Sequence, residues 1–157
     1  TIQIKDSIAY NKLQSITALM MTLPGVPVIY YGDEIGDPGG NDPDNRRMMR
    51  FENLNAHEAN TKQIAEKLVH LRRNSLPLVY GDFIWIKTDD HVLAYQRNYF
   101  GKKVLVVFNK SAKEQTVELG KLPAYAKTNF NGRLLFENNV AKLTLKPYSF
   151  DVITINL

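Results

Sequence analysis

The carboxylates and guanidinium groups between Asp33 and Arg47 are the side chains whose types and spacing could carry out chemistry in this sequence. Asp33 and Glu34 are adjacent, and two carboxyl groups can divide acid and base roles when they flank one scissile bond. Neighbouring residues of an extended chain point to opposite sides, however, so this pair is badly placed for that task. We expect Asp33 and Glu34 to bind backbone N–H groups of the loop or nearby arginines instead.

Asp42 and Arg46 lie four residues apart in the segment Asp-Pro-Asp-Asn-Arg-Arg. One helical turn after Pro43 would place both side chains on the same side. A carboxylate that accepts hydrogen bonds, beside a forked guanidinium that donates them, suits a sugar with adjacent hydroxyl groups. From the spacing alone, a surface ion pair at a loop tip is the more common outcome, so both interpretations stay open at this point.

A phosphate or metal site is a weaker interpretation of the charged residues. Three arginines could clasp a phosphate, namely Arg46, Arg47 and Arg50, but five acidic residues from Asp33 to Asp44 oppose an anion site. The nearby glycines lack the Lys-Ser/Thr that completes a phosphate-binding loop. The histidines, His57, His70 and His91, show no metal-ligand spacing. We therefore predict no metal ion and no cofactor.

The first half of the chain, which must position these residues, follows the order of elements of an α/β fold. Apolar residues recur at helical spacing over 7–23. Residues 26–31 are apolar on both faces, which is typical of a strand covered by helices in a parallel sheet. A long loop over 32–55 and a second helix over 59–73 follow. One strand cannot form a sheet, so this half requires partners outside the sequence.

The second half, after Pro77, consists of short apolar runs separated by turn residues, a pattern that predicts an antiparallel β-sandwich. Asn131-Gly132 is a strong hairpin signal, because both residues tolerate positive φ. Trp85 and Tyr95 could stack on a sugar ring, although alternation places them equally well in the core. The eight predicted strands are 82–86, 91–97, 103–109, 114–119, 126–130, 133–136, 141–146 and 149–155.

The composition narrows the class of protein. The chain has 44% hydrophobic and 23% charged residues, which is ordinary for a globular protein. The absence of cysteine excludes disulfides, and no apolar run approaches the length of a membrane span. The net charge of +4 arises from scattered lysines in the second half, so we expect no nucleic-acid partner. The start shows no signal peptide and no initiator Met, so the compartment stays open and we expect a piece of a longer chain.

Several motifs resemble the α-amylase family, glycoside hydrolase family 13, and most closely its neopullulanase and cyclomaltodextrinase group. "LPGVPVIYYGDEIG" followed by "GGNDPDNRRMMRF" resembles the segment around the eighth barrel strand. "LRRNSLPLVYGDF" resembles the last barrel helix and its exit, and "LKPYSFDVITINL" resembles the last strand of the C-terminal domain. The resemblance covers essentially the whole chain. It implies an α+β composite: residues 1–77 are the last part of a (β/α)₈ barrel, and residues 78–157 are a β-sandwich.

The resemblance also assigns roles to residues. The family's retaining mechanism uses an Asp nucleophile, a Glu acid/base and a second Asp, on loops after the fourth, fifth and seventh strands. This sequence begins after the last of them, so we expect no catalytic residue here. Asp42 and Arg46 match an Asp-Pro-x-x-Arg pattern that hydrogen-bonds the glucose unit next to the cleavage subsite on the non-reducing side. One departure is "MMRF", where relatives often carry Pro and Trp.

The resulting hypothesis is a C-terminal fragment of an α-glucan hydrolase that acts on maltodextrin, pullulan or cyclodextrin. Its partners would be an α-glucan oligosaccharide, bound through the complete barrel, and the missing N-terminal part of the enzyme. Association into homo-oligomers stays open, and no membrane partner is expected. Two alternatives also stay open: a stand-alone carbohydrate-binding or structural β-sandwich, and a fragment of a transglycosylase or isomerase of the same family.

Overall fold

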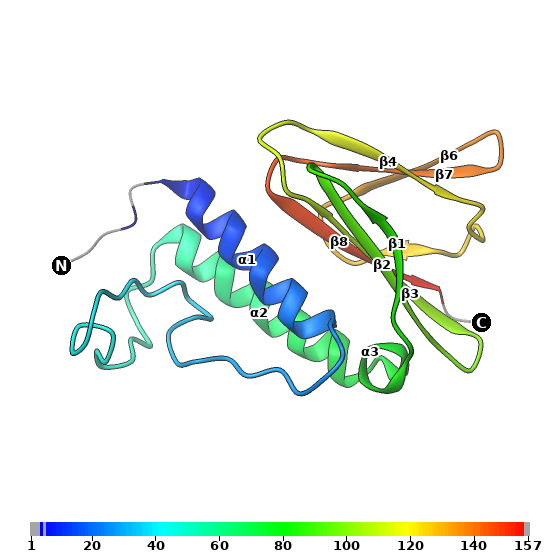
Figure 1. The fold of residues 1–157 in the computed structure, drawn as a ribbon. Coiled ribbons are helices and arrows are strands. Elements are labelled where there is room, and N and C mark those ends of the chain that lie inside the picture. Colours follow the sequence, from blue (N-terminus) through cyan, green and yellow to red (C-terminus); the bar gives the residue numbers. More distant parts are fainter. Residues whose placement is uncertain (1–3, 5, 156–157) are drawn as a thin grey trace.

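The chain folds into three layers, as the computed structural model of residues 4 and 6–155 shows (Figure 1). Helices cover one face of a five-stranded antiparallel sheet, and a three-stranded antiparallel sheet covers the other face. The helices are α1 (Ser7–Thr22), α2 (Ala56–Arg73) and α3 (Leu76–Tyr80). The first sheet has the order β1 (Ile84–Thr88), β2 (Val92–Tyr99), β3 (Lys102–Asn109), β8 (Ser149–Ile155) and β5 (Lys127–Thr128). The second sheet has the order β4 (Gln115–Gly120), β7 (Val140–Leu145) and β6 (Arg133–Glu137).

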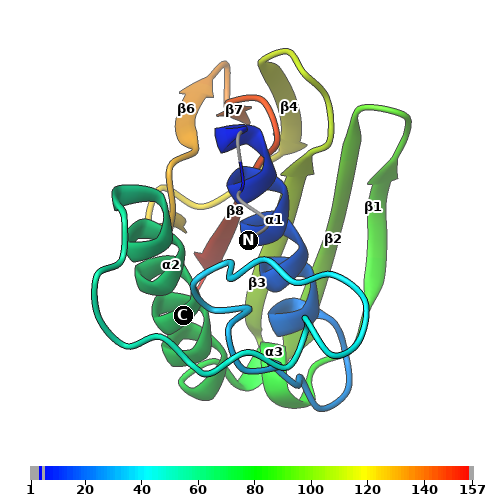
Figure 2. The same cartoon turned by 90° about the vertical axis from the view of Figure 1, so that its left-hand side faces the viewer.

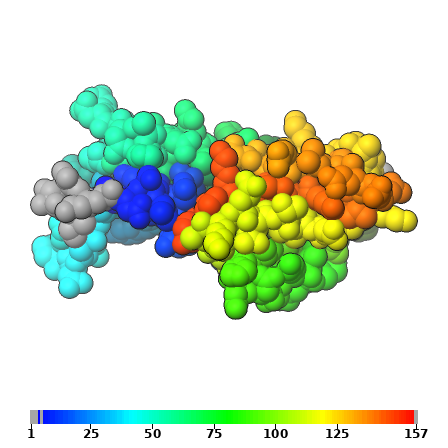
Figure 3. Space-filling model, turned by 90° about the horizontal axis from the view of Figure 1, so that it is seen from above, coloured from blue at the N-terminus to red at the C-terminus, as the bar shows by residue number. Residues whose placement is uncertain are grey.

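Helices α1 and α2 form the outer layer and lie side by side against the larger sheet (Figure 2). The first predicted helix is confirmed, with Asp6 as its N-cap and Pro24 just beyond its end. The second begins at residue 56, three residues earlier than predicted. Asn55 and Glu58 explain the difference, because they form a capping box in which each side chain accepts from the other's backbone N–H. Seen from above, the helices form one end of the molecule and the sandwich the other (Figure 3).

The strand predicted over residues 26–31 is absent, and this prediction is wrong for the chain as it stands. The segment has no strand pairing, and Val26 and Val28 are 90% and 73% exposed. A β-strand needs a hydrogen-bonded neighbour on at least one edge, and no segment among the described residues pairs with this one. The apolar sequence of a buried strand is therefore present without the sheet that would bury it.

The strands predicted for the second half are confirmed, and no strand end differs from its prediction by more than two residues. The central strand β3 is buried on both faces, which explains its continuous apolar sequence. Val104 and Val106 pack with α1 and α2, whereas Leu105 and Val107 pack with the smaller sheet. The short helix α3 was not predicted, because Pro77 suggested a break; proline is tolerated in the first turn of a helix.

The hairpin predicted at Asn131-Gly132 is also wrong. The β6–β7 hairpin turns at Asn138 and Asn139, whose φ angles are 48° and 67°. Gly132 instead lies where the chain passes from β5 in one sheet to β6 in the other. Its N–H donates to Asp151 Oδ2 at 2.6 Å, and a Cβ at this position would lie 2.8 Å from the same oxygen. The glycine is needed for this close approach and not for a turn.

Two buried arginines bind the end of α1. Arg97, on β2, donates to the carbonyl oxygens of Thr22, Gly81 and Asp82, each at 2.8 Å. Arg72, on α2, donates to three further carbonyl oxygens, those of Met21, Leu23 and Gly25, at 2.5–3.0 Å. Burial lowers the pKa of both guanidinium groups. Hydrogen bonds therefore link the helical layer to the sandwich. The division into two domains after residue 77 stays a prediction.

Candidate functional site

The loop over residues 32–55, which leads into α2, carries the predicted site residues. Asp42 and Arg46 contact each other through two pairs of atoms, Nε to Oδ1 at 2.7 Å and Nη2 to Oδ2 at 3.0 Å. Their side chains are 65% and 63% exposed. A hydrogen-bonded turn brings them together, because the Arg46 N–H donates to the Pro43 carbonyl oxygen at 3.0 Å. The Asp42 and Arg46 side chains therefore meet as expected, but a tighter hydrogen-bonded turn replaces the expected helical turn.

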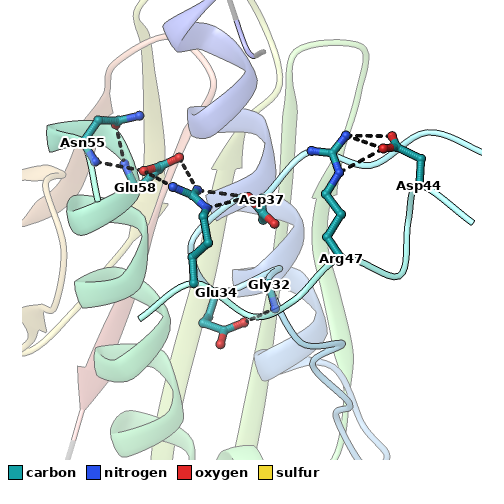
Figure 4. A network of polar contacts seen from close by, with 8 residues as sticks. Gly32, Glu34, Asp37, Asp44, Arg47, Asn55 and Glu58 are labelled. Atoms are coloured by element: carbon teal, nitrogen blue, oxygen red, sulfur yellow. Dashed lines mark hydrogen bonds and ion pairs between the residues drawn. The ribbon is translucent and has the colours of Figure 1, made fainter. Parts of the chain in front are cut away.

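Glu34 supports the loop, as predicted. Its Oε2 accepts a hydrogen bond from the Gly32 N–H at 2.8 Å (Figure 4). Asp33 lies in the same turn and lines a small hollow together with Tyr30, Tyr31 and other loop residues. The carboxylate of Glu34 is thus engaged with the backbone, which is how a loop support behaves and not how one half of an acid–base pair behaves.

Asp44 and Arg47 form a second ion pair in the loop, and this pair was not predicted. The Arg47 guanidinium donates to both Asp44 carboxylate oxygens at 2.6–3.0 Å, and the Gly40 N–H adds a bond at 2.8 Å. These contacts, with Arg47 the main cause, lower the pKa of the Asp44 carboxyl. The spacing of three residues was the signal available in the sequence.

Arg50, within the "MMRF" segment, links the loop to the first turn of α2. Its Nη2 lies 2.6 Å from Glu58 Oε1 and 3.0 Å from Asp37 Oδ1. The Glu58 side chain is only 8% exposed and also accepts from the Asn55 N–H at 2.9 Å. Burial opposes ionisation of Glu58, but the bonds from Arg50 and Asn55 outweigh it and leave its pKa lowered. All three loop arginines are thus engaged with carboxylates, which disfavours a phosphate site.

Replacing Arg50 with methionine should loosen this loop. Because buried Glu58 loses its charged partner, we expect loop opening to become easier by about 1–2 kcal/mol, or roughly 5- to 30-fold faster hydrogen exchange over 37–50. Since the folded-state pKa of Glu58 is lowered, this stabilisation exists above its ordinary value of 4.5 and is lost as the pH falls through the folded-state value. Hydrogen exchange with mass spectrometry at pH 7 measures the effect.

The matched control for Arg50 is Lys142→Met, which removes the exposed ion pairs to Glu118 and Glu137 on the sandwich. It should leave exchange in the loop unchanged, because surface pairs contribute little and these lie on another element. Equal loop exchange in Arg50→Met and the wild type would contradict the tethering role.

Of the two aromatic residues considered for sugar stacking, Tyr95 lies in the core and Trp85 lies at the surface. Tyr95 is fully buried, its hydroxyl lies 2.5 Å from Thr22 Oγ1, and burial raises its pKa to about 12. Tyr95 therefore belongs to the core and cannot stack on a ligand. Trp85 is 54% exposed, and its ring packs edge-on against Phe83 and Tyr95.

The described residues hold neither a metal-binding cluster nor a membrane-spanning helix. His57 stacks on the Tyr10 ring at a centroid distance of 5.3 Å. No group of three or more His, Asp and Glu side chains in the described part of the chain is arranged to hold a metal ion. Of the three helices described, none has the length and apolar character needed to cross a membrane.

Comparisons with known proteins agree with this architecture. Residues 83–152 match the family model of the maltogenic amylase C-terminal domain. A cyclomaltodextrinase of Thermoanaerobacter pseudethanolicus is 36% identical over 114 residues, which cover 71% of this chain and 19% of the relative. A cyclomaltodextrin glucanotransferase of Geobacillus stearothermophilus is 38% identical over 135 residues, covering 83% and 18%. The crystal structure of an α-amylase from Geobacillus thermoleovorans, complexed with acarbose, superimposes with a TM-score of 0.76 at 27% identity, covering 97% and 34%.

The fold and these matches place the chain in the α-amylase family of glycoside hydrolases, as the C-terminal portion of a member. Within the family, its relatives include cyclomaltodextrinases and a maltogenic α-amylase. The chain spans about a fifth of the length of the curated relatives described above. The antiparallel sandwich corresponds to the C-terminal domain of these enzymes, whereas the barrel assignment and the role of Asp42 and Arg46 stay predictions.

Proposed function

We propose that this chain is the C-terminal part of an α-glucan-cleaving glycoside hydrolase that acts on maltodextrin, pullulan or cyclodextrin by a retaining mechanism. In the proposal, residues 1–77 supply the last helix–strand–loop–helix unit of its (β/α)₈ barrel. Residues 78–157 supply the sandwich behind it. The catalytic carboxylates belong to loops that precede this chain in the complete enzyme.

The observation that carries the proposal is the exposed apolar segment 26–31 between α1 and α2. In a (β/α)₈ barrel such a segment is a strand, hydrogen-bonded to a neighbour on each edge and flanked by helices. Val26 and Val28, exposed here, would then be covered. The loop over 32–55 would follow the C-terminal end of that strand, which is where barrel enzymes carry their functional residues.

Asp42 and Arg46 would hold a glucose unit and would not cleave it. The guanidinium offers donors and the carboxylate offers acceptors, so the two groups together match the hydroxyls on adjacent sugar carbons. Their mutual ion pair fixes both side chains before a sugar arrives, which lowers the entropic cost of binding. The Arg50 tether to α2 supports the loop that presents them.

The test is an assay of reducing-sugar release from maltodextrin. The full-length enzyme should release sugar, whereas purified residues 1–157 should not, because the nucleophile and the acid/base are missing. Sugar release by residues 1–157 at a rate near that of the full-length enzyme would contradict the proposal.

A transglycosylase is the second candidate, because one relative at 38% identity is a cyclomaltodextrin glucanotransferase. Hydrolase and transferase differ in what accepts the glycosyl group, water or another sugar. Chromatography of the products from maltohexaose separates the two. Shorter linear sugars alone support the hydrolase, and cyclic or longer products support the transferase.

A further inference from the structure

Asn131 and Gly132 form the one Asn-Gly sequence in this chain, and neither a hairpin nor the loop site uses it. They belong to the β5–β6 linker, residues 129–132, in which the chain passes from the larger sheet to the smaller one. Asparagine is among the thermally labile residues of proteins. It is most labile before glycine, because glycine has no side chain to shield the next backbone nitrogen. Asn131 is exposed, so water and buffer ions reach it.

Deamidation at this sequence requires the Gly132 backbone nitrogen as the nucleophile. The nitrogen loses its proton and bonds to Asn131 Cγ, the bond from Cγ to Nδ2 breaks, and ammonia leaves with the proton. A cyclic imide remains. Water then opens the imide at either carbonyl group, which leaves aspartate or isoaspartate at position 131. In isoaspartate the main chain runs through the side chain, so the backbone is longer by one carbon.

Asp151, on β8, binds this nitrogen in the folded molecule and is itself 0% exposed. Its Oδ2 accepts from the Gly132 N–H at 2.6 Å, and its Oδ1 accepts from the N–H groups of Asn129 and Phe130 at 2.9 and 3.1 Å. Both oxygens accept hydrogen bonds, which suits the ionised carboxylate although burial raises its pKa. Removing the Gly132 proton would place a negative nitrogen beside this buried carboxylate, and like charges repel strongly there.

The linker is also held too tightly for the nitrogen to attack. A Cβ on Gly132 would lie 2.7 Å from Leu143 Cδ1 and 2.8 Å from Asp151 Oδ2, so the space around this residue is filled. The peptide between Asn131 and Gly132 would have to rotate for the attack, and the N–H bonds to Asp151 oppose that rotation. The attack therefore requires the linker to leave Asp151 first, by local or global unfolding.

We propose that Asn131 is a deamidation site that Asp151 keeps unreactive while the β5–β6 linker is closed. Opening of the linker frees the Gly132 nitrogen, and deamidation then makes the opening irreversible. The imide nitrogen carries no hydrogen, so the buried carboxylate loses one of its donors. Isoaspartate lengthens the backbone beside a residue whose surroundings are filled. A chain that has stayed open is thus modified and cannot close as before.

The test compares the full-length enzyme incubated at pH 7 in buffer with the same enzyme unfolded in guanidinium chloride. Trypsin cuts after Lys127 and Arg133, so residues 128–133 are recovered as one peptide. Chromatography with mass spectrometry then separates asparagine, aspartate and isoaspartate at position 131. We expect deamidation to be at least about tenfold slower in the folded enzyme, because it requires opening of the linker. Asn129 is the internal control, since Phe130 follows it and shields the next nitrogen.

Asp151→Asn tests the carboxylate itself. It removes the charge and leaves one oxygen for three N–H groups, so the folded variant should deamidate at Asn131 at least about fivefold faster than the folded wild type. Circular dichroism verifies that the variant is folded. The matched control is Asp89→Asn, because Asp89 also accepts backbone N–H bonds, from His91 and Val92, but lies in another turn. Its rate of deamidation at position 131 should equal that of the wild type.

Three results would overturn the proposal. The first is equal deamidation at position 131 in the folded and the unfolded wild type, and the second is no deamidation in guanidinium chloride. Neither depends on whether Asp151→Asn folds. The third is a folded Asp151→Asn variant that deamidates at the wild-type rate, which would assign the protection to packing and not to the carboxylate. After the denaturant is diluted, isoaspartate should be enriched in the chains that fail to refold, and an equal content in refolded chains would contradict the irreversible step.

Discussion

Replacing Arg46 with alanine in the full-length enzyme is expected to lower kcat/KM on maltodextrin roughly 5- to 150-fold, equivalent to about 1–3 kcal/mol of transition-state binding. The guanidinium would be lost as a charged donor to the sugar. Asp42 would also lose the partner that fixes its carboxylate, since the two side chains contact each other through two pairs of atoms. Initial rates over a range of maltodextrin concentrations measure the change.

The control for Arg46 is Arg133→Ala, which removes an exposed arginine from β6 on the sandwich. It should leave kcat/KM unchanged, because it lies on a different element and away from the loop over 32–55. If Arg46→Ala also left kcat/KM unchanged, the sugar-holding role would be wrong, although the rest of the fold would still stand.

Arg97→Met is expected to destabilise the protein by about 3–5 kcal/mol and to lower its Tm by roughly 10 °C. The substitution keeps much of the buried volume but leaves three carbonyl oxygens, those of Thr22, Gly81 and Asp82, without their charged donor. Arg97 is 1% exposed, so water cannot replace the guanidinium without opening the contact between α1 and the sheet. Calorimetry or urea unfolding at pH 7 measures the loss.

Arg73→Met is the matched control for Arg97, because Arg73 is an exposed arginine of α2. Surface substitutions of this kind usually change stability by less than about 0.5 kcal/mol. A Tm of Arg97→Met within a degree of the wild type would show that the carbonyl oxygens find other donors.

Local patterns were enough to predict the sandwich and both long helices. Apolar residues alternate with polar ones in a strand that is buried on one face, and they are continuous in a strand that is buried on both faces. The continuous apolar sequence of β3 is the plainest example. The errors have one cause, which is that a local pattern does not reveal its partner. Residues 26–31 have the sequence of a buried strand but no neighbour among the described residues. Asn131-Gly132 has the sequence of a turn, but the Gly132 N–H instead donates a hydrogen bond to the carboxylate of Asp151.

The candidate site was predictable to the extent that its contacts are close in sequence. Asp42 and Arg46 are four residues apart, and they meet as expected. The tether from Arg50 to Asp37 spans 13 residues, and its position depends on how the loop folds back on α2. The Tyr80 and Tyr99 rings meet across the intervening β1–β2 hairpin, so no sequence period indicates their contact. Such contacts become visible only when the topology is known.

Because β3 is buried on both faces, it limits the positions at which this protein could recombine with a related enzyme. One face of the larger sheet packs on the smaller sheet, and the other face packs on Ala18, Met21 and Leu68 of the helices. A crossover at residue 78 would give the sandwich a foreign helical layer, with mismatched side chains against Val104 and Val106 and with the carbonyl oxygen that Arg97 binds at Thr22 displaced. The smallest exchangeable unit therefore begins at or before α1, so the last helices and the sandwich should be transferred between enzymes as a single block.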